Sequence, residues 1–185
     1  MDSKTEGNRE YGRSYTVNDS TYNFSSYYSG LNGVHSLGLV NITSPVDGLM
    51  HNHFAGGLSI FSPSDLVSFY GLYNSGYMRD SKAFSFQLVT SQGTRYSISI
   101  SDEDKFEAFG QTYLSDIDIL SNIFEFLIQV TPDKNSTANE KAFLNFFQSN
   151  DSGMTLYTGN SSFTKWTKVS LSDDGTIKKE DCKED

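Results

Sequence analysis

Cysteine and positive charge are both scarce in this sequence. Cys182 is the only cysteine among the 185 residues, so no disulfide can close within the chain and no zinc site built on several cysteines is possible. Lys and Arg number 14 against 23 Asp and Glu, which gives a formal net charge of −9. Because such a surface repels phosphate groups, we expect no nucleic-acid partner. Any bound metal must be held by histidine, carboxylate and water.

Long hydrophobic runs are also missing. No apolar stretch approaches the roughly 20 residues that a transmembrane helix needs, and the start of the chain lacks the basic and apolar segments of a secretory signal peptide. We therefore expect no membrane partner. The compartment stays open, because the abrupt polar start MDSKTEGNREYG also fits a piece of a longer, exported protein. The oligomeric state is open as well.

Aromatic residues, by contrast, make up 14% of the chain, which predicts a core built from Phe and Tyr as much as from aliphatic side chains. The length fits one domain with a substantial core. We expect residues 1–9 to form a flexible N-terminus and residues 10–177 the single domain. Residues 178–185 (KKEDCKED) are then an acidic, flexible tail.

Hydrophobic periodicity predicts strands and helices in mixed order along the chain. Strands are expected at 10–17, 34–42, 48–54, 154–160 and 166–180, the last with an Asp-Gly turn, and as a hairpin at 83–101. Helices are expected from Pro63 to Gly76, over 102–130 with a break near Gly110, and over 140–150. This order predicts an α/β (α+β) fold in which helices flank a mixed β-sheet.

The segment DGLMHNHFAGGLSIFSPSDL (residues 47–66) contains a candidate metal site. His51 and His53 are two residues apart on an expected strand, so both imidazoles point to the same face. Asp65 lies in the first turn of the next helix and can complete the group. Two imidazoles, one carboxylate and a water form a common catalytic zinc shell.

A purely structural interpretation of the same segment is also open. A buried histidine on an aromatic-rich strand is often only hydrogen-bonded within the core. Ser62 as N-cap, Pro63 at the first helical position and Asp65 at the third form a capping box that explains these residues without a metal. His35, the third histidine, lies in another segment and is expected to be structural or exposed.

The stretch HNHFAGGLSIFSPSD resembles the signature of the JAMM metalloproteases, the catalytic members of the Jab/MPN family. In that family His-x-His-Pro is followed by a short loop and by Ser-x-x-Asp at the head of a helix. The resemblance implies a JAMM/cytidine-deaminase-like sandwich that cleaves amide bonds in a peptide or protein substrate. It also implies a Zn²⁺ cofactor bound by His51, His53 and Asp65, and a Ser62 that stabilises the oxyanion.

This chain departs from the family pattern at two points. Phe54 stands where the family usually has Pro, and the gap between His53 and Asp65 is one residue longer. The extra residue lies in a glycine-containing loop that can absorb it. The segment from Ser152 to Ile177 is similar to the ends of uncharacterised bacterial proteins with the same HxH core, which indicates a divergent bacterial-type member and identifies no substrate.

The resemblance further implies a catalytic glutamate on an early strand. The acidic residues upstream of His51 are Asp2, Glu6, Glu10, Asp19 and Asp47. Glu10 is our candidate for the general base because it opens a strand-like run and precedes Tyr-Gly, which allows close approach. Glu6 is the alternative, and Glu10 could equally be an exposed acid at a strand end. If the acid is missing, the chain is a catalytically inactive JAMM-like binding or scaffold domain.

Overall fold

The computed structural model of the chain describes residues 1–37 and 42–182. The strands are β1 (Tyr11–Asn18), β2 (Thr21–Phe24), β3 (Tyr28–Ser29), β4 (Gly48–His53), β5 (Ser85–Thr90), β6 (Arg95–Ile100), β7 (Met154–Gly159), β8 (Trp166–Leu171) and β9 (Ile177–Asp181). The α-helices are α1 (Pro63–Asn74), α2 (Glu103–Phe109), α3 (Ile117–Asn122) and α4 (Ser136–Ser149). Shorter helical turns are η1 (Asp2–Lys4), η2 (Gly110–Leu114) and η3 (Ile123–Leu127), of which the last two are π-helical.

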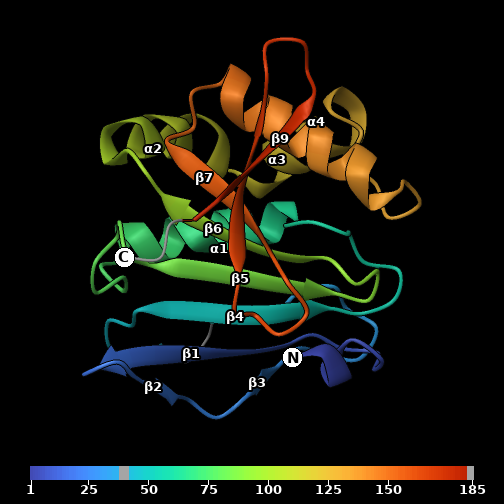
Figure 1. Cartoon of the computed structure of the whole chain (residues 1–185). Coiled ribbons are helices and arrows are strands. Elements are labelled where there is room, and N and C mark those ends of the chain that lie inside the picture. The colour runs from blue at the N-terminus through green and yellow to red at the C-terminus, as the bar shows by residue number, and fades with distance from the viewer. Residues whose placement is uncertain (38–41, 183–185) are drawn as a thin grey trace.

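The described strands form a single nine-stranded mixed sheet (Figure 1). Its order is β2-β1-β4-β5-β6-β7-β8-β9, and β3 also pairs with β1. The neighbours β4 and β5 are parallel, because α1 crosses over between them, while the other pairs are antiparallel. In Figure 1, β1, β4 and β5 lie side by side, and β9 lies at a steep angle to them. The predicted α+β class with a mixed sheet is confirmed.

One hydrophobic cluster joins the sheet to helices α1–α4. Its six largest fully buried side chains are all phenylalanines, namely Phe61, Phe69, Phe84, Phe86, Phe106 and Phe143. Phe69 of α1 stacks on Phe86 of β5 with ring centroids 5.5 Å apart. The aromatic core expected from composition is therefore present, and it holds α1 firmly against β4 and β5.

Of two expected helix boundaries, one is confirmed and one is wrong. The α-helix α2 ends at Phe109 with Gly110 as its C-cap, and the chain continues as the π-helical η2. A Cβ at Gly110 would lie 2.1 Å from the Tyr70 ring, so glycine there serves close packing. The next α-helix, α3, follows Asp116, whose carboxylate caps it. Helix α4 begins at Ser136 rather than Glu140, because the Asn135 side chain caps it by accepting from the Ala138 amide.

The expected strand over 34–42 is also wrong for residues 34–37, which are irregular, while residues 38–41 lie outside the described part. At the N-terminus, η1 contacts the domain: Arg95 forms an ion pair with Asp2 at 2.8 Å. At the C-terminus, residues 178–181 belong to β9 and pair with β8, so the predicted tail is too long by those residues. Residues 183–185 of that tail lie outside the described part. No helix in the described part of the chain is long and apolar enough to cross a membrane.

Candidate metal centre

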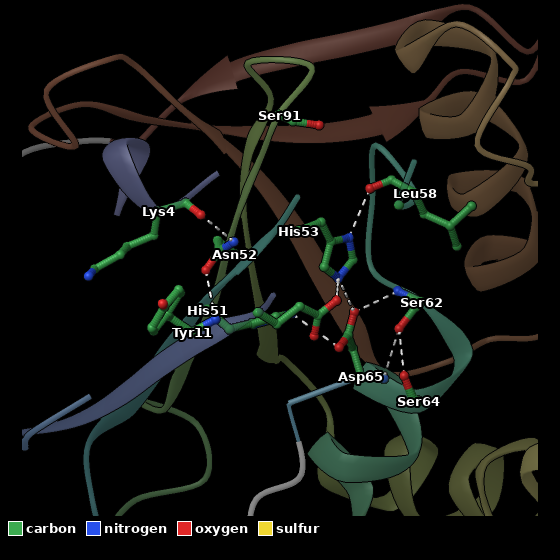
Figure 2. A network of polar contacts seen from close by, with 12 residues as sticks. Lys4, Tyr11, His51, Asn52, His53, Leu58, Ser62, Ser64, Asp65 and Ser91 are labelled. Carbon is green, nitrogen blue, oxygen red and sulfur yellow. Dashed lines mark hydrogen bonds and ion pairs between the residues drawn. The ribbon is translucent and has the colours of Figure 1, made fainter. Parts of the chain in front are cut away.

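His51, His53 and Asp65 lie together at the end of β4, with ligand atoms within 4.8 Å of one another. The Asp65 carboxylate bridges the two rings: Oδ1 is 3.1 Å from Nε2 of His51 and Oδ2 is 3.1 Å from Nε2 of His53. Figure 2 shows Asp65 reaching from the start of α1 toward the histidines. This buried group could hold a metal ion.

Strand β4 aims both histidines at the helix side of the sheet. The strand is buried on both faces, and the His51 and His53 rings lie edge to face with centroids 5.3 Å apart. The His51 ring also stacks on Phe86 at 5.0 Å. The aromatic core thus fixes the ring plane of His51 before any ligand binds.

A backbone carbonyl sets the tautomer of His53. The Nδ1–H group donates to the Leu58 carbonyl oxygen at 2.8 Å, which leaves Nε2 on the side of Asp65 (Figure 2). Metal-binding histidines usually have such a second hydrogen bond, because it orients the ring and directs the free lone pair. Leu58 belongs to the glycine-containing loop after β4, so this loop connects β4 to α1 and also orients the His53 ring.

Asp65 is held by the start of α1. The Asp65 Oδ2 atom accepts from the Ser62 amide at 2.7 Å, and the Ser62 hydroxyl accepts from the Asp65 amide at 3.2 Å. Both halves of the predicted capping box are therefore present. The structure shows that cap and cluster coexist, because one carboxylate contacts both the helix N-terminus and the histidines.

Glu10, the residue directly before β1, completes the cluster. Gly12 pairs with His51 in the antiparallel β1–β4 ladder, and continuing this register by two residues places Glu10 opposite His53. The Glu10 Oε1 atom lies 3.8 Å from His53 Nε2. Glu10 is only 1% exposed, so the interpretation of Glu10 as an exposed strand-end acid is wrong. The alternative residue, Glu6, is exposed.

Asn52 fixes the strand that presents Glu10. Its side chain points to the other face of β4, where Oδ1 accepts from the Tyr11 amide at 2.8 Å and Nδ2 donates to the Lys4 carbonyl oxygen at 3.2 Å. Asn52 is fully buried. Sequence reasoning missed this role, although a polar residue between two histidines on a buried strand was a signal for it.

The pKa values of three groups in this cluster differ from their ordinary values. Burial raises the pKa of Glu10 to about 7, although nearby His53 opposes that change. Burial disfavours a charged His53, but Asp65, Glu10 and the Leu58 carbonyl outweigh burial and raise its pKa to about 9. Burial also disfavours a charged Asp65, yet His51 and His53 hold its pKa well below the usual value.

Several buried polar atoms of the cluster have no hydrogen-bond partner. They are both carboxylate oxygens of Glu10 and both ring nitrogens of His51. The Nε2 atom of His51 is close to Asp65 but is not oriented for a hydrogen bond. Buried polar atoms are rarely left unpaired, so these atoms point to a missing partner between them. Two imidazoles and a carboxylate fit a divalent cation in that position, which would displace the proton of His53.

Ser62 and His35 occupy the edge of the cluster. The Ser62 hydroxyl lies 2.9 Å from that of Ser64 and caps α1. His35 is exposed, as expected, and its ring stacks on Phe54 at a centroid distance of 3.9 Å. Phe54 therefore anchors the segment around His35 beside the site.

Searches of this chain against protein-family models, curated proteins and solved structures find no match. Its function must be argued from the site.

Proposed function

We propose that this protein is a JAMM-like, zinc-dependent hydrolase of amide bonds, acting as a peptidase or isopeptidase. The observation that carries the proposal is the position of Glu10. A buried carboxylate without a hydrogen-bond partner faces His53 beside His51 and Asp65. These are the residue types that a metallohydrolase needs, and three separate segments of the chain bring them together.

His51, His53 and Asp65 are the residues that would hold the ion, and Glu10 is the general base. When bound, zinc polarises the amide carbonyl and makes water a nucleophile near neutral pH. Glu10 accepts a proton from the attacking water and passes it to the leaving amine. Burial, which raises the pKa of Glu10 to about 7 in the metal-free protein, favours uptake of this proton.

Ser62 has a supporting role in this proposal. It lies at the N-terminus of α1, where its hydroxyl can turn from Ser64 toward negative charge that develops on the substrate oxygen. The same hydroxyl accepts from the Asp65 amide, so its removal also loosens a ligand. A silent scaffold domain would have no need for Glu10, and its burial beside His53 therefore favours the enzyme.

The direct test is metal content combined with amide hydrolysis. Protein purified without chelator is analysed for zinc and incubated with a mixture of peptides and lysine-linked isopeptides. We expect near-stoichiometric zinc and slow cleavage by the wild type. His53→Ala should lose both, because it removes a ligand.

Glu10→Gln separates the base from the ligands. It should retain zinc but lose cleavage by about 10²-fold or more, as expected for a general base. His35→Ala is the matched histidine control and should retain zinc, since His35 is exposed and outside the ligand group. Wild-type protein without zinc, or cleavage unchanged in Glu10→Gln, would contradict the proposal.

A further inference from the structure

The cavities around the cluster differ greatly in size. The one that reaches His51 and Asp65 has a volume of about 40 Å³, which holds water but no substrate group. A second cavity of about 350 Å³ reaches Glu10, His53 and Ser62. Because it contains the proposed base and one ligand, a substrate must approach the cluster through this second cavity. Its volume is at the low end for ligand sites and suits one side chain rather than a long peptide.

The walls of the larger cavity are mainly apolar. Leu58 and Pro63 come from the loop after β4 and the start of α1, Ile117 from α3, and Pro132 from the loop before α4. His35 closes one side, and Gly57 lies directly beneath it: a Cβ there would lie 2.9 Å from His35 Nδ1. Partial burial, together with nearby His53, lowers the pKa of His35.

Besides Glu10 and the two histidines, the polar residues of the cavity walls are uncharged serines, namely Ser36, Ser62, Ser64 and Ser121. Among the described residues that line it, Glu10 is the only acidic one, and there is no Lys or Arg. An acidic substrate group would be repelled by Glu10 and by the net charge of −9. A basic group would be attracted by Glu10, but it would lose its hydration against the apolar part of the walls.

Ile117 is a wall residue whose apolar side chain is partly exposed to solvent. It is 41% exposed at the first position of α3, where the Asp116 cap holds the backbone by accepting from the Asp118 and Ile119 amides. An aliphatic group in the cavity would cover this surface without rearrangement of the helix.

From these walls we propose that the cavity between His35 and Ile117 is a specificity subsite for an uncharged aliphatic side chain next to the scissile amide. This inference rests on the proposed hydrolase function, because the cavity can select a substrate only if Glu10 and His53, which line it, take part in catalysis. The substrate class is thereby narrowed to amides that follow or precede a residue such as leucine.

The test measures binding of small hydroxamates to the zinc-loaded, full-length protein by calorimetry. Acetohydroxamate reports access to the metal alone, and the N-acetyl hydroxamates of Leu, Ala, Asp and Lys report the subsite. We expect the leucine probe to bind about tenfold tighter than the alanine probe, and the Asp and Lys probes to gain nothing. Ile117→Ser should abolish most of this preference without changing acetohydroxamate binding.

Two further variants test whether the preference depends on the side chain at position 117. Ile119→Ser is the matched control, since Ile119 is 51% exposed on the same helix but does not line the cavity. It should retain the preference. Ile117→Lys should reverse the preference toward the aspartate probe. Equal binding of all side chains, or equal effects of the two serine variants, would overturn the subsite while leaving the hydrolase intact. Failure of acetohydroxamate to bind zinc-loaded protein would overturn both proposals.

Discussion

Glu10 carries a carboxylate into a nearly fully buried position next to His53 and Asp65. This burial is unfavourable for folding, because a buried carboxylate without a hydrogen-bond partner costs free energy when it ionises. Residues that destabilise the fold in this way concentrate at functional sites. At the scale of single residues, Glu10 is therefore the residue on which the proposed catalytic function depends.

This burial predicts a pH dependence of stability in the zinc-free protein. Burial raises the folded-state pKa of Glu10 to about 7, above the ordinary value of 4.5. Its stabilising contribution is therefore complete below pH 4.5 and is lost as the pH rises through 7. Glu10→Gln, which stays neutral, should match the wild type at pH 4 and exceed its unfolding free energy by on the order of 3 kcal/mol at pH 8.

Urea unfolding with excess chelator at both pH values measures this difference. His53 and Asp65 titrate in both proteins, but Glu10 raises the pKa of His53, so the measured difference includes this coupling. A gap between the two proteins that is the same at both pH values would mean that Glu10 is not buried in the folded state.

At the scale of elements, the contact between β1 and β4 decides where Glu10 lies relative to the histidines. Gly12 pairs with His51, and a Cβ at position 12 would lie 2.2 Å from Leu37 Cδ2, 3.1 Å from the Met50 carbonyl oxygen and 3.4 Å from His51 Cβ. The flexible end of Leu37 can move away, but the Met50 backbone cannot. Glycine is thus required for close approach of the strand that presents Glu10.

Gly12→Val should therefore push β1 away from β4. We expect a loss of about 1–3 kcal/mol in unfolding free energy and at least a tenfold loss of amide cleavage, with zinc retained. Zinc retention distinguishes a displaced base from lost ligands, since all three proposed ligands lie on β4 and α1. Zinc analysis, urea unfolding and the cleavage assay measure the three quantities.

Gly71→Ala is the control for this element. Gly71 lies on α1 with nothing within 4 Å of its would-be Cβ, so alanine there should be neutral or slightly stabilising. If Gly12→Val behaves like Gly71→Ala, the β1–β4 contact does not position the base.

At the scale of the whole molecule, the site lies where the sheet and α1 meet over the aromatic core. The parallel strands β4 and β5 and the crossing helix α1 all contribute to one hydrophobic cluster. A bound ion would join β4 to α1 at one point, so its free energy of binding adds to the stability of the entire domain.

Zinc removal should therefore lower the melting temperature. A metal present at about 1,000 times its Kd adds about 4 kcal/mol, which corresponds to roughly 10 °C for a domain of this size. Thermal denaturation with zinc and with chelator measures the shift. His51→Ala should show no difference between the two conditions, whereas His35→Ala should behave like the wild type. An identical melting temperature for the wild type in both conditions would argue against a metal site.

Much of the site could be predicted, because it depends on contacts between residues that are close in the sequence. The two-residue spacing of His51 and His53 on a strand places them on one face, and the Ser62–Asp65 box begins a helix by contacts within four residues. The hairpin of β5 and β6 followed from alternation and a short turn in the same way. The extent of α4 was missed because a side-chain cap at Asn135, not hydrophobic periodicity, decides where it begins.

The sequence by itself determined the ligand types, their shared face and the helix that carries Asp65, because strand alternation and helix capping act between near neighbours. Only the tertiary structure decided that Glu10 rather than Glu6 faces His53, that Leu58 sets the ring tautomer, and that residues 178–181 form an edge strand. These outcomes depend on which strands pair across long stretches of chain, and such pairing follows from the packing of the whole core. The candidate metal ligands are thus fixed by local sequence, while the buried carboxylate of Glu10 joins them only through the fold.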